Sequence, residues 1–121
     1  MIKTLALLIT FLFSFANAEL EEQKINYLLD EVEKSGLTFS RNNETHSAKE
    51  ARAHLKFKYH SAKGFFFSSS SITARNFIDK IASSSSTTGE LYYIISKDGK
   101  KIPTKEWLDE KLKKFAPPKK K

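Results

Sequence analysis

The stretch from Gly36 to Lys58 constrains the fold more than any other part of this 121-residue chain. It begins with a glycine, a residue that commonly ends a helix because it adopts left-handed backbone at the C′ position. Leu37 to Arg41 then alternates apolar and polar side chains, which is typical of a short strand with one buried face. Asn42 and Asn43 tolerate left-handed backbone. The stretch therefore predicts a helix end, a short strand and a turn in succession.

A helix is expected to follow this turn. Ser47 and Glu50 have the spacing of a capping box, in which the serine is the N-cap and the glutamate stands at N3. Small and apolar residues recur on one face as far as about Ala62, and Gly64 is expected to stop the helix. On one flank of that face, Glu50, His54 and Lys58 stand four residues apart.

The other elements are predicted from apolar periodicity and from turn residues. They are a helix at 20–34, a helix at 74–82 capped by Thr73, a strand at 91–95, a type I′ turn at Asp98-Gly99 and a last helix capped by Thr104. Because residues 91–95 are all apolar, that strand is expected to be covered on both faces. We predict an α+β fold of about four helices packed around a small two- or three-stranded antiparallel sheet, with 37–41 paired to 91–95.

The run from Phe65 to Ser71 fits no single period, since three phenylalanines are followed by four serines. We interpret it as an extended connection that places one or two phenylalanines in the core. A flexible linker and an adhesive surface patch are the alternatives.

The first 18 residues have the pattern of a secretory signal peptide. Lys3 supplies a positive charge, residues 5–15 are an apolar run, and Ala16-Asn17-Ala18 is a small-x-small cleavage site. The apolar run is shorter than the ~20 residues of a membrane helix, although an uncleaved anchor is the alternative. We expect a signal peptide at 1–18, a single domain at 19–116 and a basic tail at 117–121. The protein is then periplasmic or secreted, without a transmembrane span after cleavage. The chain has no cysteine, so neither a lipoprotein site nor a disulfide is available to it.

Charge is distributed unevenly along the chain. The formal net charge is +7, and removal of Lys3 with the signal peptide lowers it to +6. Acids concentrate in residues 19–34, whereas residues 111–121 contain six lysines and no acid. A basic end of this kind indicates an anionic envelope component as a partner, or simply a solvated tail. No aromatic residues are interleaved with the terminal lysines beyond Phe115, so no specific nucleic-acid site is predicted.

Segments from almost the whole of 19–116 resemble a small family of exported bacterial proteins of unknown function, the YfeK-like proteins. The resemblance is carried by these segments: Glu22 to Leu29, Val32 to Gly36, Phe39-x-Arg41-Asn42, Ala51-x-x-His54-Leu55-x-x-Lys58, Phe77 to Ser85, and Asp98-Gly99 with Trp107-Leu108. It implies a periplasmic protein of a Gram-negative bacterium and assigns no activity. The chain departs from the family pattern at Asn43, where a glycine is expected; asparagine is tolerated at a left-handed turn position.

The sequence contains no motif of a known active site. His46, His54 and His60 lack metal-ligand spacing, so no metal site and no cofactor are predicted. A small hydrolase would need the imidazole of His54 beside a loop serine (Ser83, Ser85 or Ser86), with Glu50 orienting the histidine. This hydrolase is our alternative hypothesis.

The favoured hypothesis is a non-catalytic binding or interaction module. Its candidate binding residues are Arg41, His54 and Lys58, with Tyr92 and Trp107 as neighbours. An arginine at a strand end can hold a carboxylate or phosphate with two parallel hydrogen bonds. In the structural alternative, Arg41 and His54 instead hydrogen-bond the backbone of the loop after Ser83. A periplasmic protein or an anionic envelope component is the expected partner.

Overall fold

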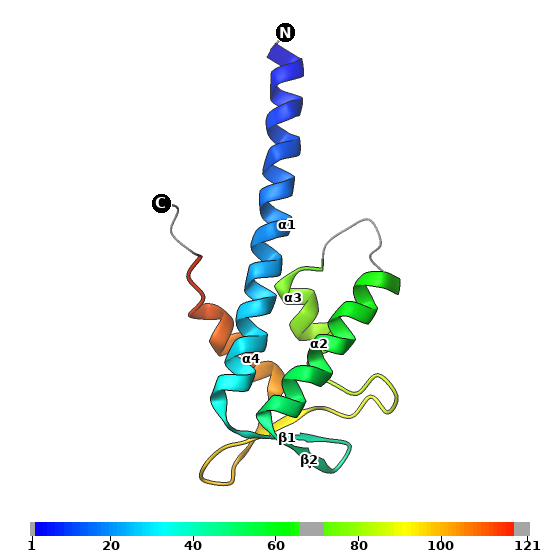
Figure 1. The fold of residues 1–121 in the computed structure, drawn as a ribbon, viewed down its shortest axis with the longest axis vertical. Helices are drawn as coiled ribbons and strands as arrows, with labels where there is room; N and C mark the ends of the chain where they lie inside the picture. Colours follow the sequence, from blue (N-terminus) through cyan, green and yellow to red (C-terminus); the bar gives the residue numbers. More distant parts are fainter. Residues whose placement is uncertain (1, 66–71, 118–121) are drawn as a thin grey trace.

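The protein is described by a computed structural model that covers residues 2–65 and 72–117. Its strands come in two consecutive pairs, each between helices (Figure 1). They are α1 (Ile2–Ser35), β1 (Thr38–Arg41), β2 (Glu44–His46), α2 (Ala48–Phe65), α3 (Ala74–Asn76), the π-helix η1 (Phe77–Ile81), β3 (Tyr93–Ile95), β4 (Lys101–Pro103) and α4 (Thr104–Lys113).

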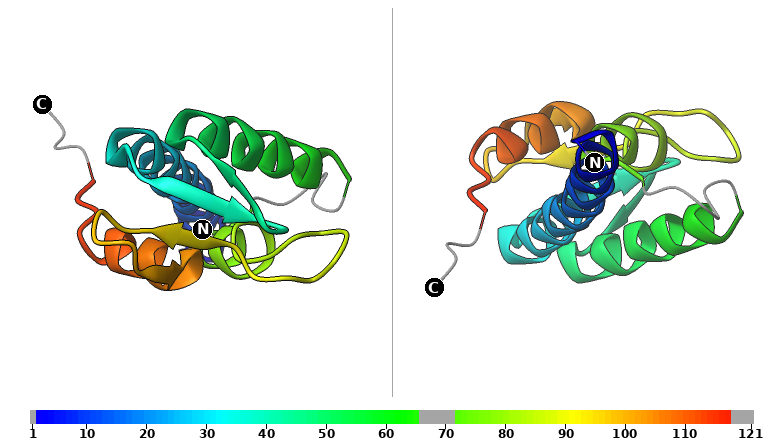
Figure 2. Two further views of the ribbon diagram at one scale, coloured as in Figure 1. Left: turned by 90° about the horizontal axis from the view of Figure 1, so that it is seen from below. Right: turned by 90° about the horizontal axis from the view of Figure 1, so that it is seen from above.

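The four strands form one antiparallel sheet in the order β2-β1-β3-β4. The helices lie on one side of this sheet, as the view from below in Figure 2 shows. The predicted α+β class is confirmed, with four strands rather than two or three. The predicted pairing of the two inner strands is also confirmed, since Phe39 of β1 is opposite Ile94 of β3.

Strand β2 is the element that the sequence analysis missed. Asn42 and Asn43 both have positive φ, at 51° and 66°, and Arg41 pairs with Glu44 across them. A two-residue turn with both residues left-handed is a type I′ hairpin turn. The chain therefore folds straight back on β1, although Glu44-Thr45-His46 contains no apolar residue to indicate a strand.

The predicted type I′ turn at Asp98-Gly99 is wrong in type. Of these two residues only Gly99 has positive φ, at 87°, and its amide donates to the carbonyl of Ser96. The turn runs from Ser96 to Gly99, and the next residue, Lys100, accepts from the amide of Ser96. The hairpin between β3 and β4 forms as expected, but through a longer loop.

Strand β3 is buried on one face only, which corrects the expectation that 91–95 is covered on both. Tyr92 and Ile94 face the core, whereas Leu91 is 49% exposed and Tyr93 and Ile95 are half-buried. All the helices of the described residues pack on the same side of the sheet, so alternate residues point outward.

Helix α1 runs through the centre of the packed body. Ile25, Leu28, Leu29 and Val32 recur at helical spacing and are almost completely buried, as predicted. The helix ends at Gly36, whose φ is 63°, also as predicted. It extends back to Ile2 rather than beginning near Leu20, and this N-terminal part projects beyond the body in Figure 1.

Helix α2 begins with the predicted capping box. The Ser47 hydroxyl accepts from the Glu50 amide at 3.1 Å, and the Glu50 carboxylate accepts from the Ser47 amide at 2.9 Å. The predicted stop at Gly64 is wrong, because the helix passes through Gly64 to Phe65. The interpretation of the Phe-Ser run falls on residues 66–71, which lie outside the described residues.

The next helix changes its winding within two turns. Thr73 caps α3 as predicted, since its hydroxyl accepts from the Asn76 amide at 3.0 Å. From Phe77 the winding widens to the π form, and the Ala82 amide donates to the Phe77 carbonyl at 2.9 Å. π-helical turns of this kind occur frequently at functional sites.

Helix α4 closes the body on the side away from α2. Thr104 is its first residue rather than its cap; Pro103 stands at the N-cap position. The predicted cap is therefore wrong, and the buried Thr104 hydroxyl has no hydrogen-bond partner among the described residues. The Tyr27 hydroxyl of α1 donates to the Lys111 carbonyl at 3.1 Å, which fixes α4 against α1.

Within residues 17–64 and 72–117, no helix is both long and apolar enough to cross a membrane. Of the predicted basic tail, 118–121 lie outside the described residues.

Candidate functional site

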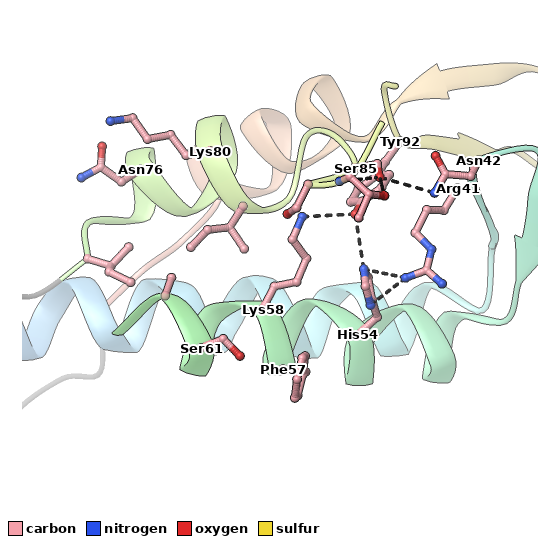
Figure 3. A pocket seen from close by; sticks show the side chains of 15 residues that line it. Arg41, Asn42, His54, Phe57, Lys58, Ser61, Asn76, Lys80, Ser85 and Tyr92 are labelled. Carbon is pink, nitrogen blue, oxygen red and sulfur yellow. Dashed lines mark hydrogen bonds between the residues drawn. The ribbon is translucent and has the colours of Figure 1, made fainter. Parts of the chain in front are cut away.

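A groove of about 830 Å³ lies beside helix α2 (Figure 3). Its walls are α2, the α3–η1 helix and the loop that follows η1, and the end of β1 completes it. The lining residues are Arg41, Asn42, His54, Phe57, Lys58, Ser61, Ala62, Ile72, Asn76, Lys80, Ile81, Ser85, Ser86, Thr87 and Tyr92.

Strand pairing brings Arg41 and Tyr92 together. Ser40 is paired with Tyr93, so Arg41 and Tyr92 come next along the two antiparallel strands. Both are two residues from a buried core residue of their strand, and side chains two apart share a face. Arg41 and Tyr92 therefore project toward the helices. The backbone of Tyr92 is held by hydrogen bonds to Ser83 and Thr104.

Helix α2 supplies the other side of the same cluster. His54 and Lys58 are four residues apart and project from successive turns toward the sheet end. The Lys58 ammonium donates to the Ser84 carbonyl at 3.0 Å and to the Tyr92 hydroxyl at 3.1 Å. We call Arg41, His54, Lys58 and Tyr92 the basic cluster.

The hydrogen bonds of the cluster define the protonation of His54. Arg41 Nη1 lies 2.7 Å from the ring nitrogens, and His54 Nε2 lies 3.3 Å from the Tyr92 hydroxyl. A guanidinium only donates, so the imidazole must offer it an unprotonated nitrogen. Either ring nitrogen of the neutral imidazole can accept from Arg41, because both lie at the same distance from Nη1.

Burial and neighbouring positive charge shift the pKa values of the cluster. The pKa of His54 falls to about 4, first because of burial and then because of the charges of Arg41, Lys58 and His46. The pKa of Lys58 falls to about 8, again through burial and then Arg41. Burial raises the pKa of Tyr92, against the influence of Arg41. At neutral pH the cluster therefore contains a neutral imidazole, a neutral phenol and two cations.

The cations of the groove have no carboxylate partners in the part of the chain that the structure describes. Among the described lining residues Arg41, Lys58 and Lys80 are cationic and none is acidic. No acid of the described residues lies within 4.0 Å of their charged nitrogens. By contrast, Arg52 and Arg75 each lie within 4.0 Å of two carboxylates. The groove is thus a concentration of unneutralised positive charge.

The loop beside the cluster is fixed by side-chain hydrogen bonds. Asn42 of the β1–β2 turn donates to the Ser85 hydroxyl at 3.4 Å and accepts from the Thr88 hydroxyl at 2.7 Å. The Ser85 hydroxyl oxygen also accepts from the amides of Thr87 and Thr88. Lys58 and Asn42, rather than Arg41 and His54, therefore bind this loop to the rest of the protein.

The geometry does not favour the hydrolase hypothesis. In the described residues, the Ser83 hydroxyl donates to the Asp79 carbonyl and the Ser85 hydroxyl is engaged within its own loop. Glu50 caps α2 instead of orienting His54. A histidine with a pKa of about 4 is also a weak general base at neutral pH.

The structure brings four of the five predicted binding residues together. The fifth, Trp107, lies elsewhere and packs edge-on against Phe39 with ring centroids 6.3 Å apart. The sequence analysis missed Asn42 as a loop contact and Lys80 as a lining residue. The i, i+4 spacing of Asn76 and Lys80 places them on one helix face, but nothing in the sequence placed that face opposite α2.

The comparisons with known proteins agree with the resemblance given above. The YfeK protein of Salmonella typhimurium (strain LT2), whose name describes it as uncharacterized, is 43% identical over 89 residues, which cover 72% of this chain and 69% of the relative. No solved structure matches the chain. The family of unknown function DUF5329 matches residues 19–116. The chain therefore belongs to this family of unknown function.

Proposed function

We propose that the protein is a non-catalytic binding module that holds an anionic ligand in the groove beside α2. One observation carries this proposal: the described lining includes Arg41, Lys58 and Lys80 and no acid. Isolated cations are costly to remove from water, so partly buried ones normally have an anion beside them. A carboxylate or phosphate in the groove would be that anion.

The hydrogen-bonding inventory of the basic cluster supports an acceptor ligand. Arg41 and Lys58 have donors only, and the Tyr92 oxygen accepts from Lys58 and lies 3.3 Å from His54 Nε2. The Arg41 guanidinium has further N–H groups beyond the one that contacts His54. An oxyanion is the chemical group that satisfies several such donors at once.

We further propose that this module acts outside the cytoplasm. The small-x-small sequence ends at Ala18, immediately before the first residue of the family match. The part of α1 after Ala18 also contacts the rest of the domain: the Glu21 carboxylate accepts from the Ala74 amide at 2.8 Å. A small anionic component of the cell envelope is the partner that fits both features.

A thermal-shift comparison tests the proposed function. The chloride of the buffer is replaced by phosphate or by acetate at constant ionic strength, and the melting temperature is measured. Binding to the native state raises this temperature by mass action. The rise should be seen in the parent and disappear in Lys58→Met, which removes the charge and shortens the unbranched side chain by one atom.

Lys56→Met is the matched control. Lys56 lies on the same helix, is exposed, and does not line the groove. Phosphate also stabilises proteins generally by exclusion from their surfaces, and this effect is the same in all three proteins. A rise of equal size in the parent, Lys58→Met and Lys56→Met therefore contradicts anion binding in the groove.

A further inference from the structure

The groove differs in chemistry between its two ends. Donation from Lys58 to the Ser84 carbonyl places the end of η1 opposite the middle of α2. Ala62 is eight residues beyond His54 on α2, and Ile72 directly precedes Thr73, the N-cap of α3. In Figure 3 Asn76 of α3 lies at the end of the groove away from His54. The basic cluster therefore occupies one end, and the groove away from it is lined by aliphatic residues together with Ser61, Asn76 and Lys80.

The aliphatic part has a buried floor. Ile72 and Ile81 are almost completely buried and nevertheless line the groove, together with the half-buried Ala62. At the opening, Phe57 is 70% exposed, the most exposed of the large apolar side chains in the described residues. In Figure 3, however, its ring extends away from Lys58 and from η1, so the buried floor supplies the apolar surface of the groove. A ligand lying along α2 would thus have apolar surface below it.

The length of this path sets the size of the ligand. His54 and Ala62 are eight residues apart on α2, a separation of about 12 Å along a helix that rises 1.5 Å per residue. An extended chain advances ~1.2 Å per bond, as in a stretched backbone. A linear chain of roughly ten atoms therefore spans the path.

We propose that the ligand is an amphipathic anion, with one carboxylate or phosphate head group held by the basic cluster and an unbranched apolar tail along Ala62, Ile72 and Ile81. This proposal rests on the proposed anion-binding function and specifies its ligand class. Medium-chain fatty carboxylates and monoalkyl phosphates have this chemistry. Lys80 and Asn76 lie at a distance from the basic cluster in Figure 3. The alternative ligand is therefore one that carries a second negative charge on its tail.

Calorimetric titration with a homologous series tests the proposal. Acetate, hexanoate, octanoate and octyl phosphate are titrated below their micelle concentrations into the full-length protein. Each added methylene should tighten binding about two- to fourfold, with one ligand bound per chain. Carboxylate and phosphate members of equal length report which head group the cluster prefers.

Two variants and three further ligands separate the possible outcomes. Lys58→Met should weaken both acetate and octanoate, whereas Lys56→Met, which lies outside the groove, should weaken neither. If acetate binds through Lys58 while chain length adds nothing, the anion-binding function stands and the amphipathic ligand is refuted. If octanol binds as tightly as octanoate, or if no anion binds at all, both proposals fail. If the dicarboxylate sebacate binds more tightly than decanoate, the tail carries a second charge and the proposed ligand class is wrong.

Discussion

Lys58 is held in an environment that opposes its charge. Its pKa lies at about 8 because of burial and the nearby Arg41, whereas that of an unfolded lysine is about 10.4. Between these values the unfolded chain binds more protons than the folded one, so this residue makes stability rise with pH across that window. At neutral pH Lys58 is charged in both states, and the folded state carries the penalty. A side chain that costs stability in this way is expected where it contacts a ligand.

His54 provides a test of the electrostatics at the level of one residue. Its pKa lies at about 4 in the folded protein and near 6.5 in an unfolded chain. As the pH falls from 6.5 toward 4, the unfolded state takes up a proton that the folded state refuses, and stability is lost. His54→Gln, which cannot be protonated, should lose less melting temperature over this range than the parent.

The measurement is the melting temperature of both proteins between pH 7.5 and pH 4. Carboxylates titrate in the same range, but they are common to both proteins and cancel in the comparison. His60→Gln is the control, because His60 is exposed on the same helix and outside the groove. Parallel profiles for the parent and His54→Gln would show that the imidazole is not held neutral by its surroundings.

At the scale of elements, the β1–β2 hairpin connects local backbone geometry to the groove. Asn42 and Asn43 both have left-handed backbone, a conformation that glycine adopts without steric cost. Only Asn42 has a second role, since its side chain binds Ser85 and Thr88. Asn43→Gly should therefore leave the free energy of unfolding unchanged or raise it by up to about 1 kcal/mol, because it removes the steric cost of left-handed backbone. Asn42→Gly should lower it by about 1 kcal/mol through the lost hydrogen bonds.

Chemical denaturation of the two variants measures this difference directly. The same replacement is made at adjacent positions of one turn, so the change in the unfolded chain is the same. Equal effects would mean that the contact of Asn42 with the loop contributes nothing to stability. Anion affinity should also fall in Asn42→Gly alone, because the loop that faces Lys58 loses its attachment to the hairpin.

The elements that the sequence predicted correctly have signals contained within a few residues. The capping box at Ser47 and the C′ glycine at Gly36 are of this kind. The wrong and missing predictions concern elements whose structure depends on contacts with residues distant in sequence. Glu44–His46 is a strand because β1 offers it an edge, and Gly64 stays helical although glycine is a poor helix former. The exposure of Leu91 follows from the helices covering only one face of the sheet.

At the scale of the whole molecule, the site is formed by three segments that are distant in sequence. Arg41 and Tyr92 could be placed together once the strand pairing was predicted, and His54 and Lys58 share a helix flank. The sequence could not show which helix lies opposite that flank, so the contribution of Lys80 was missed. Trp107 was misplaced for the same reason: α4 packs on the opposite side of the core, against Phe39.

The role of residues 1–18 also belongs to this scale. In residues 17–35 of α1, for which burial is described, the first buried residue is Ile25, and the contact of Glu21 with Ala74 also lies after Ala18. Cleavage after Ala18 would therefore remove none of these contacts. We predict that the full-length chain, expressed in a Gram-negative host, is recovered from the periplasmic fraction with Glu19 as its first residue. Mass spectrometry of the intact protein after osmotic shock measures this.

A substitution at the cleavage site makes the prediction specific. The small-x-small pattern requires a small side chain at Ala18, so Ala18→Lys should leave the chain uncleaved and attached to the membrane through residues 5–15. Lys63→Met, a change within the folded domain, is the control and should be processed like the parent. Recovery of the parent in the membrane fraction with residues 1–18 still present would instead support the uncleaved anchor. The groove would then face its ligands from a membrane surface, and the amphipathic anion would reach it from the lipid.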